Sequence, residues 1–302
     1  MTPNLEQLEA HTSFKGEQRI YRHYAETLRR PLEIAVYVPV AMLLKERPCH
    51  TTYYLPGIQT SARLVASQSD YQRYANRYDT ILVIPDLFNT YQGDDEARIG
   101  QYIHERDTLD DYLLEELPAV LRDYLATTGG RGIMGYGFGG TLAFHLARKK
   151  PDHYRSVSAL APWLGFYGTP WYKEHLARYG LPAEFDPLQW YLAHPDAAPL
   201  PLWIDQGTED GHLGSKINLH AFEEAVAPRI KSGEIWLNRR KRYDHSFYTI
   251  GKKYTVGIEG NNCRLRHRIR RIVRETCCFP KKLPYHFKNF NLAFHYINHG
   301  FA

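Results

Sequence analysis

Three segments carry residue types that together could do hydrolytic chemistry. A glycine-rich turn at residues 135–140 joins an expected strand to an expected helix. Asp210 follows a later strand, and His245 follows the last one. A histidine that is oriented by a carboxylate takes a proton and activates a nucleophile for attack on a carbonyl. Each residue alone is an ordinary loop residue, but their order and their places at strand ends favour a catalytic site.

The glycine-rich turn lacks the side chain that this chemistry needs. In the α/β-hydrolase fold the junction carries Gly-x-Ser-x-Gly, whose glycines let strand and helix pass closely. Here the run reads Gly-Tyr-Gly-Phe-Gly-Gly, with Gly137 in the place of the serine. No acyl-enzyme forms at a position without a hydroxyl oxygen. Because glycine adopts positive φ freely, we expect the turn to keep its shape and lose its reactivity.

Two backbone N–H groups are expected to stabilise a developing oxyanion. Ile58 lies in the loop after an earlier strand, and Phe138 follows Gly137. In this fold these two loops supply the donors of the oxyanion hole. If the geometry allowed it, another hydroxyl could replace the missing nucleophile, and the candidates are Thr60, Ser61 and Thr141.

A dinucleotide-binding loop is the alternative interpretation of the glycine run. That motif belongs to the first strand–helix unit and needs an acidic residue about 20 residues further on. Here the corresponding stretch, residues 155–157, reads Arg-Ser-Val, and the run lies in the middle of the pattern of strands. The spacing therefore favours a hydrolase.

Strands and helices alternate along most of the chain. Strands are expected at residues 32–38, 51–55, 80–84, 132–135, 156–161, 202–205 and 234–237. Helices are expected at 107–127, capped by Asp107 or Thr108, kinked by Pro118 and ended by Gly129 and Gly130, and at 141–150 and 219–226. This alternation predicts a mostly parallel, doubly wound α/β sheet. Residues 163–199, rich in aromatic residues and proline, predict a small inserted cap.

The overall composition is that of a globular protein. Hydrophobic residues make up 43% and charged residues 24% of the 302 residues, which excludes wholesale disorder. No apolar run approaches the ~18 residues of a membrane span, and the start resembles no signal peptide. Four cysteines are too few for a disulfide scaffold. We therefore expect a cytoplasmic protein that does not engage a membrane.

Charge is distributed unevenly along the chain. Residues 251–302 carry 11 of the 38 Lys and Arg residues but only 2 of the 33 Asp and Glu residues. Residues 264–274 predict a basic helix that could attract nucleic acid weakly and without sequence preference. A solvated appendage is the alternative. Cys263, His267, Cys277 and Cys278 fit no common zinc spacing, so no metal is expected.

Residues 1–250 resemble the S-formylglutathione hydrolase, or esterase D, family. The resemblance is carried, in the family's order, by residues 13–18, 21–24, 35–39, 54–58, 115–118, 156–159, 161–162, 204–207 and 243–248. It implies an α/β-hydrolase fold and serine-dependent ester or thioester hydrolysis without cofactor or metal. The family's substrate is S-formylglutathione, from formaldehyde detoxification. Carried over to this chain, the family's triad acid is Asp210, its base is His245, and its oxyanion hole is the backbone of Ile58 and Phe138.

The departures from this family predict an impaired enzyme. Gly137 replaces the nucleophile, the aromatic segment at 91–106 is shortened, and Thr60 stands in place of the family's cysteine. The family's last helix is missing. We expect a small ester or thioester as partner and strongly reduced catalysis. A non-catalytic remnant is the alternative, and a homodimer is compatible with either.

Residues 251–302 resemble the carboxy-terminal end of a small bacterial insertion-sequence transposase. The resemblance is carried by residues 254–255, 258–259, 261–262, 266–267, 277–279 and 281–283. Such enzymes cut DNA with three metal-binding acidic residues, and only Glu259 could correspond to one of them. A lone carboxylate cannot build a two-metal site, so DNA cleavage is not expected. The chain is thus predicted to join a hydrolase domain, 1–250, to a basic helical tail, 251–302.

Overall fold

The computed structural model describes residues 5–69, 71–122 and 124–240, and in this part of the chain nine strands form one sheet. His245 and the basic helix predicted at 264–274 lie outside the described residues. The strands are β1 (Leu5–Ser13), β2 (Gly16–Ala25), β3 (Arg30–Val38), β4 (Cys49–Leu55), β5 (Thr80–Pro85), β6 (Thr127–Tyr136), β7 (Ser156–Leu160), β8 (Leu202–Gly207) and β9 (Ile235–Arg240).

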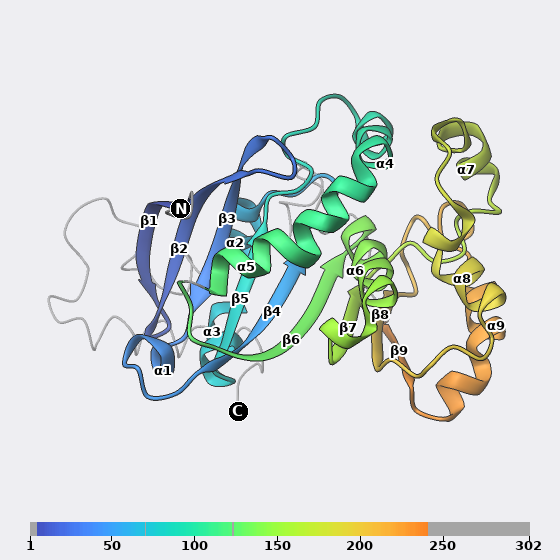
Figure 1. Cartoon of the computed structure of the whole chain (residues 1–302). Helices are drawn as coiled ribbons and strands as arrows, with labels where there is room; N and C mark the ends of the chain where they lie inside the picture. Colours follow the sequence, from blue (N-terminus) through green and yellow to red (C-terminus); the bar gives the residue numbers. More distant parts are fainter. Residues whose placement is uncertain (1–4, 70, 123, 241–302) are drawn as a thin grey trace, which may run out of the picture. The chain divides into compact units, whose positions relative to one another are not determined.

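The sheet combines a parallel part with an antiparallel edge. Its order is β1-β2-β3-β5-β4-β6-β7-β8-β9, as Figure 1 shows. From β5 to β9 all neighbours are parallel, whereas β1, β2 and β3 pair antiparallel and β3 pairs antiparallel with β5. Parallel neighbours need crossover connections, and the helices supply them. The carboxyl ends of the six parallel strands therefore meet at one edge of the sheet.

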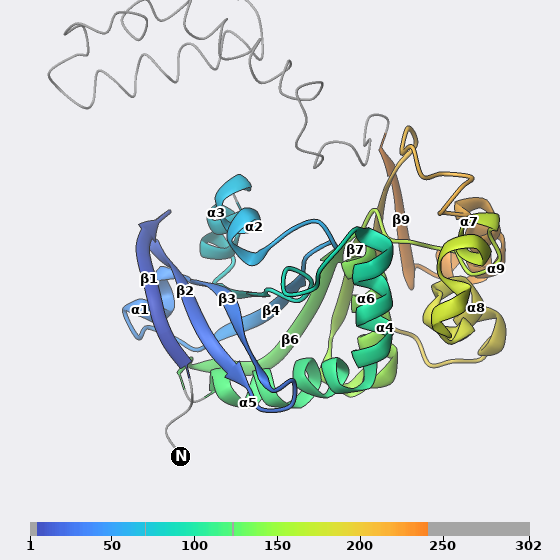
Figure 2. The ribbon, with the colours of Figure 1, turned by 90° about the horizontal axis from the view of Figure 1, so that it is seen from above.

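Helices cover both faces of the sheet. They are α1 (Val40–Leu43), α2 (Ala62–Gln68), α3 (Tyr71–Arg77), α4 (Asp95–Asp111), α5 (Leu117–Arg122), α6 (Phe138–Lys149), α7 (Pro170–His175), α8 (Pro187–Ala193) and α9 (Leu219–Lys231). Figure 2 shows α2 and α3 on one side of the sheet and α4, α5 and α6 on the other. The predicted doubly wound α/β fold is confirmed.

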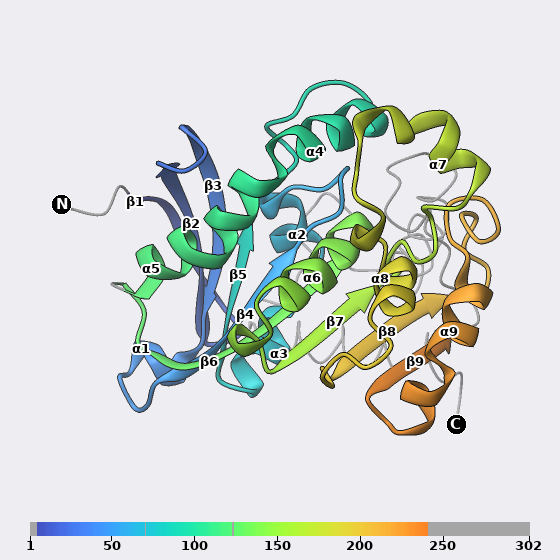
Figure 3. The ribbon, with the colours of Figure 1, turned by 45° about the vertical axis from the view of Figure 1, so that its right-hand side comes forward.

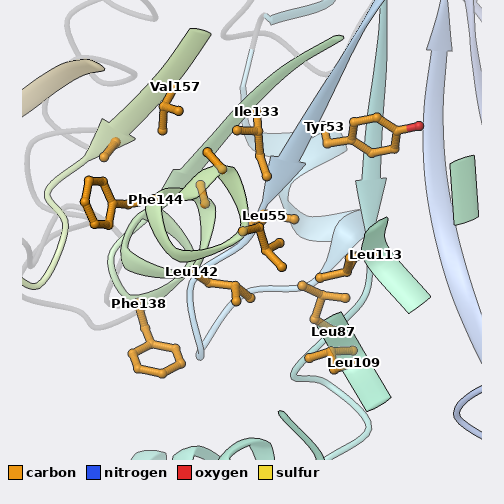
Figure 4. Packing of buried hydrophobic residues seen from close by; sticks show 14 of the residues in the cluster. Tyr53, Leu55, Leu87, Leu109, Leu113, Ile133, Phe138, Leu142, Phe144 and Val157 are labelled. Carbon is orange, nitrogen blue, oxygen red and sulfur yellow. The ribbon is translucent and has the colours of Figure 1, made fainter. Parts of the chain in front are cut away.

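Strand alternation divides the apolar side chains between two cores. Ile34 and Val36 of β3 belong to the larger core, and Ala35 and Tyr37 belong to the smaller one. Successive side chains of a strand point to opposite faces, so one apolar strand supplies both cores. Figure 4 shows the larger core where β4, β6 and β7 meet helix α6. Each such buried side chain contributes about 1.5–3 kcal/mol, which holds the strand ends in place.

The long helix predicted at 107–127 begins earlier and ends earlier. Helix α4 starts at Asp95, and the Asp94 carboxylate caps it by accepting the Ala97 N–H at 3.0 Å. Its first turns bury only a few apolar side chains among polar ones, so the pattern was weak there. The expected irregularity is present: a π-helical turn, Tyr112–Glu116, precedes Pro118. Because proline has no N–H to donate, the regular hydrogen-bond ladder cannot continue through it.

Gly129 and Gly130 do not end a helix, as the sequence had suggested, but lie inside β6. Gly129 has φ of +77°, and the pairing of β4 with β6 shifts register between Cys49 and Thr51. A glycine with positive φ accommodates such an irregularity, which is why a turn signal stands inside a strand. The hairpin of β1 and β2 was not predicted either, because most β1 side chains are polar or exposed.

The inserted segment at 163–199 folds as short helices, including α7 and α8, between β7 and β8. Figure 3 shows α7 and α8 on the β7–β9 side of the molecule. The buried Asp186 carboxylate accepts the N–H groups of Gly165, Tyr167 and Leu188 at 2.8–3.0 Å. These bonds tie the start of the segment to the start of α8. Among the described helices, none has the length and apolar character that crossing a membrane would require.

Candidate active site

The turn between β6 and α6 has an unusual backbone conformation at Gly137. Its φ is 56° and its ψ is −126°, and it caps the start of α6. Its N–H donates to the Leu160 carbonyl at 2.9 Å, and its own carbonyl accepts the Gly140 N–H at 3.0 Å. Residues with a Cβ are strained in this region of backbone space, whereas glycine is not. The chain therefore makes a sharp, unstrained turn at this position.

The flanking glycines leave no space for a side chain. A Cβ on Gly135 would lie 2.2 Å from the Gly139 carbonyl oxygen. A Cβ on Gly139 would lie 2.3 Å from the Leu55 oxygen and 2.4 Å from the Pro56 oxygen. Both contacts are with backbone, which cannot move away without displacing the start of α6 or the end of β4. The close passage of strand and helix thus depends on these two glycines.

The loop after β4 lies directly beside this turn. Leu55 pairs with Gly135 in the sheet, which brings residues 56–58 next to the start of α6. The Ile58 carbonyl accepts a hydrogen bond from Arg98 Nη1 at 3.3 Å, and Gln59 Nε2 donates to Asp95 Oδ2 at 2.8 Å. Both bonds hold the loop against α4. In the described part of the chain, neither the Ile58 N–H nor the Phe138 N–H donates to a protein acceptor.

Phe138 fixes the first turn of α6 through its ring. The side chain is buried, and its ring lies 5.5 Å from the rings of Trp163 and Phe185 and 5.3 Å from that of Tyr102. Such aromatic pairs contribute about 0.5–1.5 kcal/mol each beyond their buried area. Figure 4 shows Phe138 at the start of α6. A firmly packed side chain leaves the backbone N–H of Phe138 in a defined position.

The three other hydroxyls near the turn are engaged elsewhere. The buried Thr141 hydroxyl donates to the Trp163 carbonyl at 3.0 Å and accepts the Trp163 N–H at 2.9 Å. Thr60 Oγ1 donates to the Gly57 carbonyl at 2.9 Å, and Ser61 Oγ caps α2 by accepting the Leu64 N–H at 3.1 Å. Their geometry therefore gives no support to a substitute nucleophile.

Asp210 lies just beyond β8, two strands away from the turn. Its carboxylate is buried; Oδ1 accepts the His212 N–H at 2.9 Å and Oδ2 accepts a hydrogen bond from Gln206 Nε2 at 3.0 Å. These donors hold the carboxylate in one orientation. Strand β7 links both regions, because Leu160 pairs with Tyr136 on one side and Asp205 on the other. The turn and the acid thus share the carboxyl edge of the sheet.

His245 lies outside the described residues, and its part in the site stays a prediction. Arg240, the last residue of β9, pairs with Gly207 of β8. The described part of β9 therefore ends at the edge of the sheet where Asp210 lies.

Comparison with known proteins places this architecture in a family. The Esterase family model matches residues 25–257, which is most of the chain. The chain belongs to the Esterase family. A second family model, IS1 transposase, matches residues 219–301, so both resemblances seen in the sequence are confirmed.

Solved structures of esterases share the fold. The S-formylglutathione hydrolase from Agrobacterium tumefaciens is 28% identical with a TM-score of 0.67, and the match covers 84% of this chain and 98% of that one. The S-formylglutathione hydrolase from Staphylococcus aureus is 14% identical with a TM-score of 0.57, covering 86% and 97%. A ferulic acid esterase from Anaeromyces mucronatus is 18% identical with a TM-score of 0.59, covering 79% and 85%.

The two family matches of this Esterase member overlap at residues 219–257. The described part of the overlap contains α9 and β9, and β9 is an edge strand of the sheet, paired with β8 along six residues. These residues therefore belong to the hydrolase fold. The boundary predicted at residue 250 stays a prediction.

Two charged side chains of this Esterase member, near the turn, were not predicted from the sequence. The Lys216 ammonium lies 4.6 Å from the Trp171 ring and 5.5 Å from the Trp163 ring, and burial lowers its pKa. Asp86 follows β5 at the same sheet edge, and burial raises its pKa to about 6. Asp86 follows the strand at 80–85 directly, and the position of an acid at the end of a strand, which also pointed to Asp210, could have identified it.

Proposed function

We propose that this Esterase member has a site of the S-formylglutathione hydrolase type, for carboxylic esters and thioesters, whose catalysis is strongly impaired because Gly137 replaces the nucleophile. The observation that supports it is the backbone of Gly137, with φ 56° and ψ −126°, in a turn that keeps its flanking glycines. The backbone of this turn suits a nucleophilic side chain, but glycine supplies no oxygen atom to attack the ester carbonyl. We extend the proposal to a cytoplasmic location and a link to formaldehyde detoxification.

In this proposal the remaining groups act on a bound ester without a covalent step. The N–H groups of Ile58 and Phe138 polarise the carbonyl oxygen, and Asp210 orients His245 as a general base for water. Loss of a nucleophile costs on the order of 10⁶ in kcat, while the oxyanion hole and binding retain ~10³–10⁴ over water. The expected activity of the natural chain is therefore slow, direct hydrolysis.

The test restores the missing hydroxyl. Gly137→Ser should raise kcat/KM on 4-nitrophenyl acetate by on the order of 10³ or more, because it supplies the attacking oxygen. S-formylglutathione is assayed beside it to examine the thioester. Gly137→Ala is the matched control, since it adds the same Cβ without the oxygen. Only Gly137→Ser should react with a fluorophosphonate probe, as detected by intact-protein mass spectrometry.

Two results would contradict the proposal. One is a natural chain that turns over at ordinary enzyme rates and gains nothing from serine. The other is an acyl group attached covalently to the natural chain during turnover. A stably folded Gly137→Ser variant that stays inactive would show that the missing hydroxyl alone does not account for the impairment.

A second candidate function is a non-catalytic remnant that binds nucleic acid weakly. It is favoured by the IS1 transposase match at 219–301 and by the basic excess of residues 251–302. Phosphate attraction of this kind weakens steeply with salt and ignores sequence. Filter binding of two unrelated duplexes at about 50 and 200 mM salt tests it. Affinity that does not change with salt, or cannot be measured at the lower salt, speaks against this function.

A further inference from the structure

The ammonium of Lys216 lies against two indoles, in the loop between β8 and α9. Its Nζ is 4.6 Å from the centroid of the Trp171 ring and 5.5 Å from that of the Trp163 ring. The two rings are nearly perpendicular, with centroids 5.2 Å apart and an angle of 86° between their planes. Aromatic ring faces attract a cation. The position of this charge is therefore defined by both indoles.

The loop that carries Lys216 is held by backbone hydrogen bonds. The N–H groups of Lys216 and Ile217 both donate to the His212 carbonyl, at 2.9 and 3.0 Å, and the Ile217 side chain is fully buried. The Asn218 N–H donates to the Leu164 carbonyl at 2.8 Å, which joins this loop to the segment after β7. These contacts fix the place at which the lysine side chain begins.

Lys216 lies beside two parts of the proposed site. On the acid side, His212 of the same loop donates its N–H to Asp210 Oδ1 at 2.9 Å. On the side of the turn, the Trp163 ring lies 5.5 Å from the Phe138 ring. Lys216 is thus at the carboxyl edge of the sheet, one indole ring away from Phe138, and does not reach the turn itself.

The charge of Lys216 has no counter-charge in direct contact. In the part of the chain that the structure describes, the ammonium has neither a carboxylate partner nor a hydrogen-bond acceptor. Burial lowers the pKa of Lys216, and the charge of Asp95 raises it. Asp95 Oδ2 accepts instead from Gln59 Nε2, at 2.8 Å. A partly buried cation attracts an anion more strongly than one in bulk water does.

The surroundings of Lys216 favour a ligand with a single negative charge. One ammonium matches one carboxylate, whereas a phosphate ester carries up to two charges and would also meet the negative field of Asp95. The two indoles supply apolar surface next to the charge, against which hydrocarbon can pack.

We propose that Lys216 determines substrate specificity by binding a carboxylate of the ester or thioester. The carboxylate is remote from the reacting carbonyl, because an indole ring and the Phe138 side chain lie between Lys216 and the turn. The hydrocarbon that joins the two groups packs on Trp171. This inference rests on the proposed function, since it names the substrate class of the same site.

The first test measures binding to the full natural chain and needs no catalysis. 4-Acetamidobenzoate carries one carboxylate, methyl 4-acetamidobenzoate carries none, and an amide replaces the reacting ester in both. Ligand-observed saturation-transfer NMR titrations should show the anion binding about tenfold more tightly than the neutral compound. Equal binding of the two, or no binding of the anion up to its solubility limit, would overturn the proposal.

Three variants locate the preference for the anion. Lys216→Gln removes the charge and should reduce the preference to within about twofold. Lys216→Arg keeps the charge and should retain most of it. The matched control is Lys231→Gln, which removes an exposed ammonium from the last turn of α9 and should leave the preference intact. A preference that survives Lys216→Gln, or falls equally in Lys231→Gln, would mean that Lys216 does not bind the carboxylate.

Kinetics in the Gly137→Ser background connect this binding to the reaction. 4-Acetoxybenzoate and methyl 4-acetoxybenzoate are acetyl esters that differ at the same group. Because Lys216 lies away from the reacting carbonyl, Lys216→Gln should raise KM for the anionic ester about tenfold and change kcat little. An effect confined to kcat would contradict a role in binding. Thermal unfolding shows whether each variant is folded.

Failure of this inference and failure of the proposed function give different results. If Gly137→Ser stays inactive while the natural chain prefers the anion in the NMR titrations, the proposed catalysis is contradicted and the role of Lys216 is supported. If Gly137→Ser is active and neither measurement shows a preference for the anion, the proposed catalysis is supported and the role of Lys216 is overturned.

Discussion

The turn at Gly137 and the β8–β9 end of the same sheet differ in what holds them together. At the turn, backbone contacts closer than a Cβ would allow bring β6, α6 and the β4 loop together. At the β8–β9 end, Trp203 and Trp236 stack with ring centroids 6.0 Å apart, yet they are 42% and 60% exposed. Alternation places both indoles on the sheet face opposite Leu202 and Ile235, which belong to the larger core.

This difference separates the geometry of the site from its chemistry. Around Gly137 the backbone itself specifies the turn, so its shape does not depend on a side chain at this position. At the β8–β9 end, the large side chains of Trp203 and Trp236 face outward in the described structure, so they contribute little to the packing there. Asp210, the predicted acid of the site, follows β8 and so belongs to this second region.

The strongest test concerns the acid, in a chain that has its nucleophile restored. In the Gly137→Ser background, Asp210→Ala should lower kcat by on the order of 10⁴, because the base loses its orientation and its charge partner. Steady-state kinetics on 4-nitrophenyl acetate measures it. Glu209→Ala, the neighbouring exposed acid, is the matched control and should stay within about twofold. An active Asp210→Ala protein would remove Asp210 from the site.

A methyl group at Gly139 should disrupt the backbone-packed region. Gly139→Ala places a Cβ 2.3 Å from the Leu55 carbonyl oxygen, and such overpacking should lower the free energy of unfolding by about 3 kcal/mol or more. Urea unfolding measures the change. Gly168→Ala, where a Cβ meets nothing within 4 Å, is the control and should cost little. Equal costs at both positions would mean that close packing does not define the turn.

Asp86 is buried and follows β5 at the carboxyl edge of the sheet. It should make the free energy of unfolding depend on pH. Burial raises its folded pKa to about 6 from 3.8, so the folded state holds the proton more tightly than the unfolded state. Below pH ~4 the carboxyl is protonated in both states, so its burial as a charge costs nothing. As pH rises from ~4 through 6, up to about 3 kcal/mol of the free energy of unfolding is lost. Asp86→Asn should therefore gain stability over the natural chain between pH 4 and 7. A difference that does not change with pH would contradict the raised pKa.

Substitution of Trp236 should have the smallest effect on the free energy of unfolding. Trp236→Thr keeps a residue that favours strands and should change the free energy of unfolding by no more than about 0.5 kcal/mol, as exposed positions usually do. Chemical unfolding followed by circular dichroism avoids dependence on the indole signal. Tyr53→Thr, a buried strand position on β4, gives the contrast and should cost several kcal/mol. A large loss at Trp236 would show that other parts of the chain cover this face.

Several strands of the fold could be predicted from the local pattern of apolar residues. The strands at 80–84, 156–161 and 202–205 appeared close to their predicted bounds. The clearest is β5, which is buried along nearly its whole length and therefore apolar on both faces. The hairpin of β1 and β2 and the first half of α4 were missed, since their buried residues are spaced among polar ones. Gly129 was misassigned because a glycine signals a turn and a strand irregularity equally well.

For the site, residue identity alone established that Gly137 has no nucleophile, because an absent atom needs no structure to be recognised. The order of turn, acid and histidine along the chain was also visible there. Tertiary structure decided that Gly135 and Gly139 have no space for a Cβ, that Thr60, Ser61 and Thr141 are engaged with backbone, and that Lys216 lies against Trp163 and Trp171. These facts depend on distances between residues far apart in sequence, which only the packing of strands and helices determines.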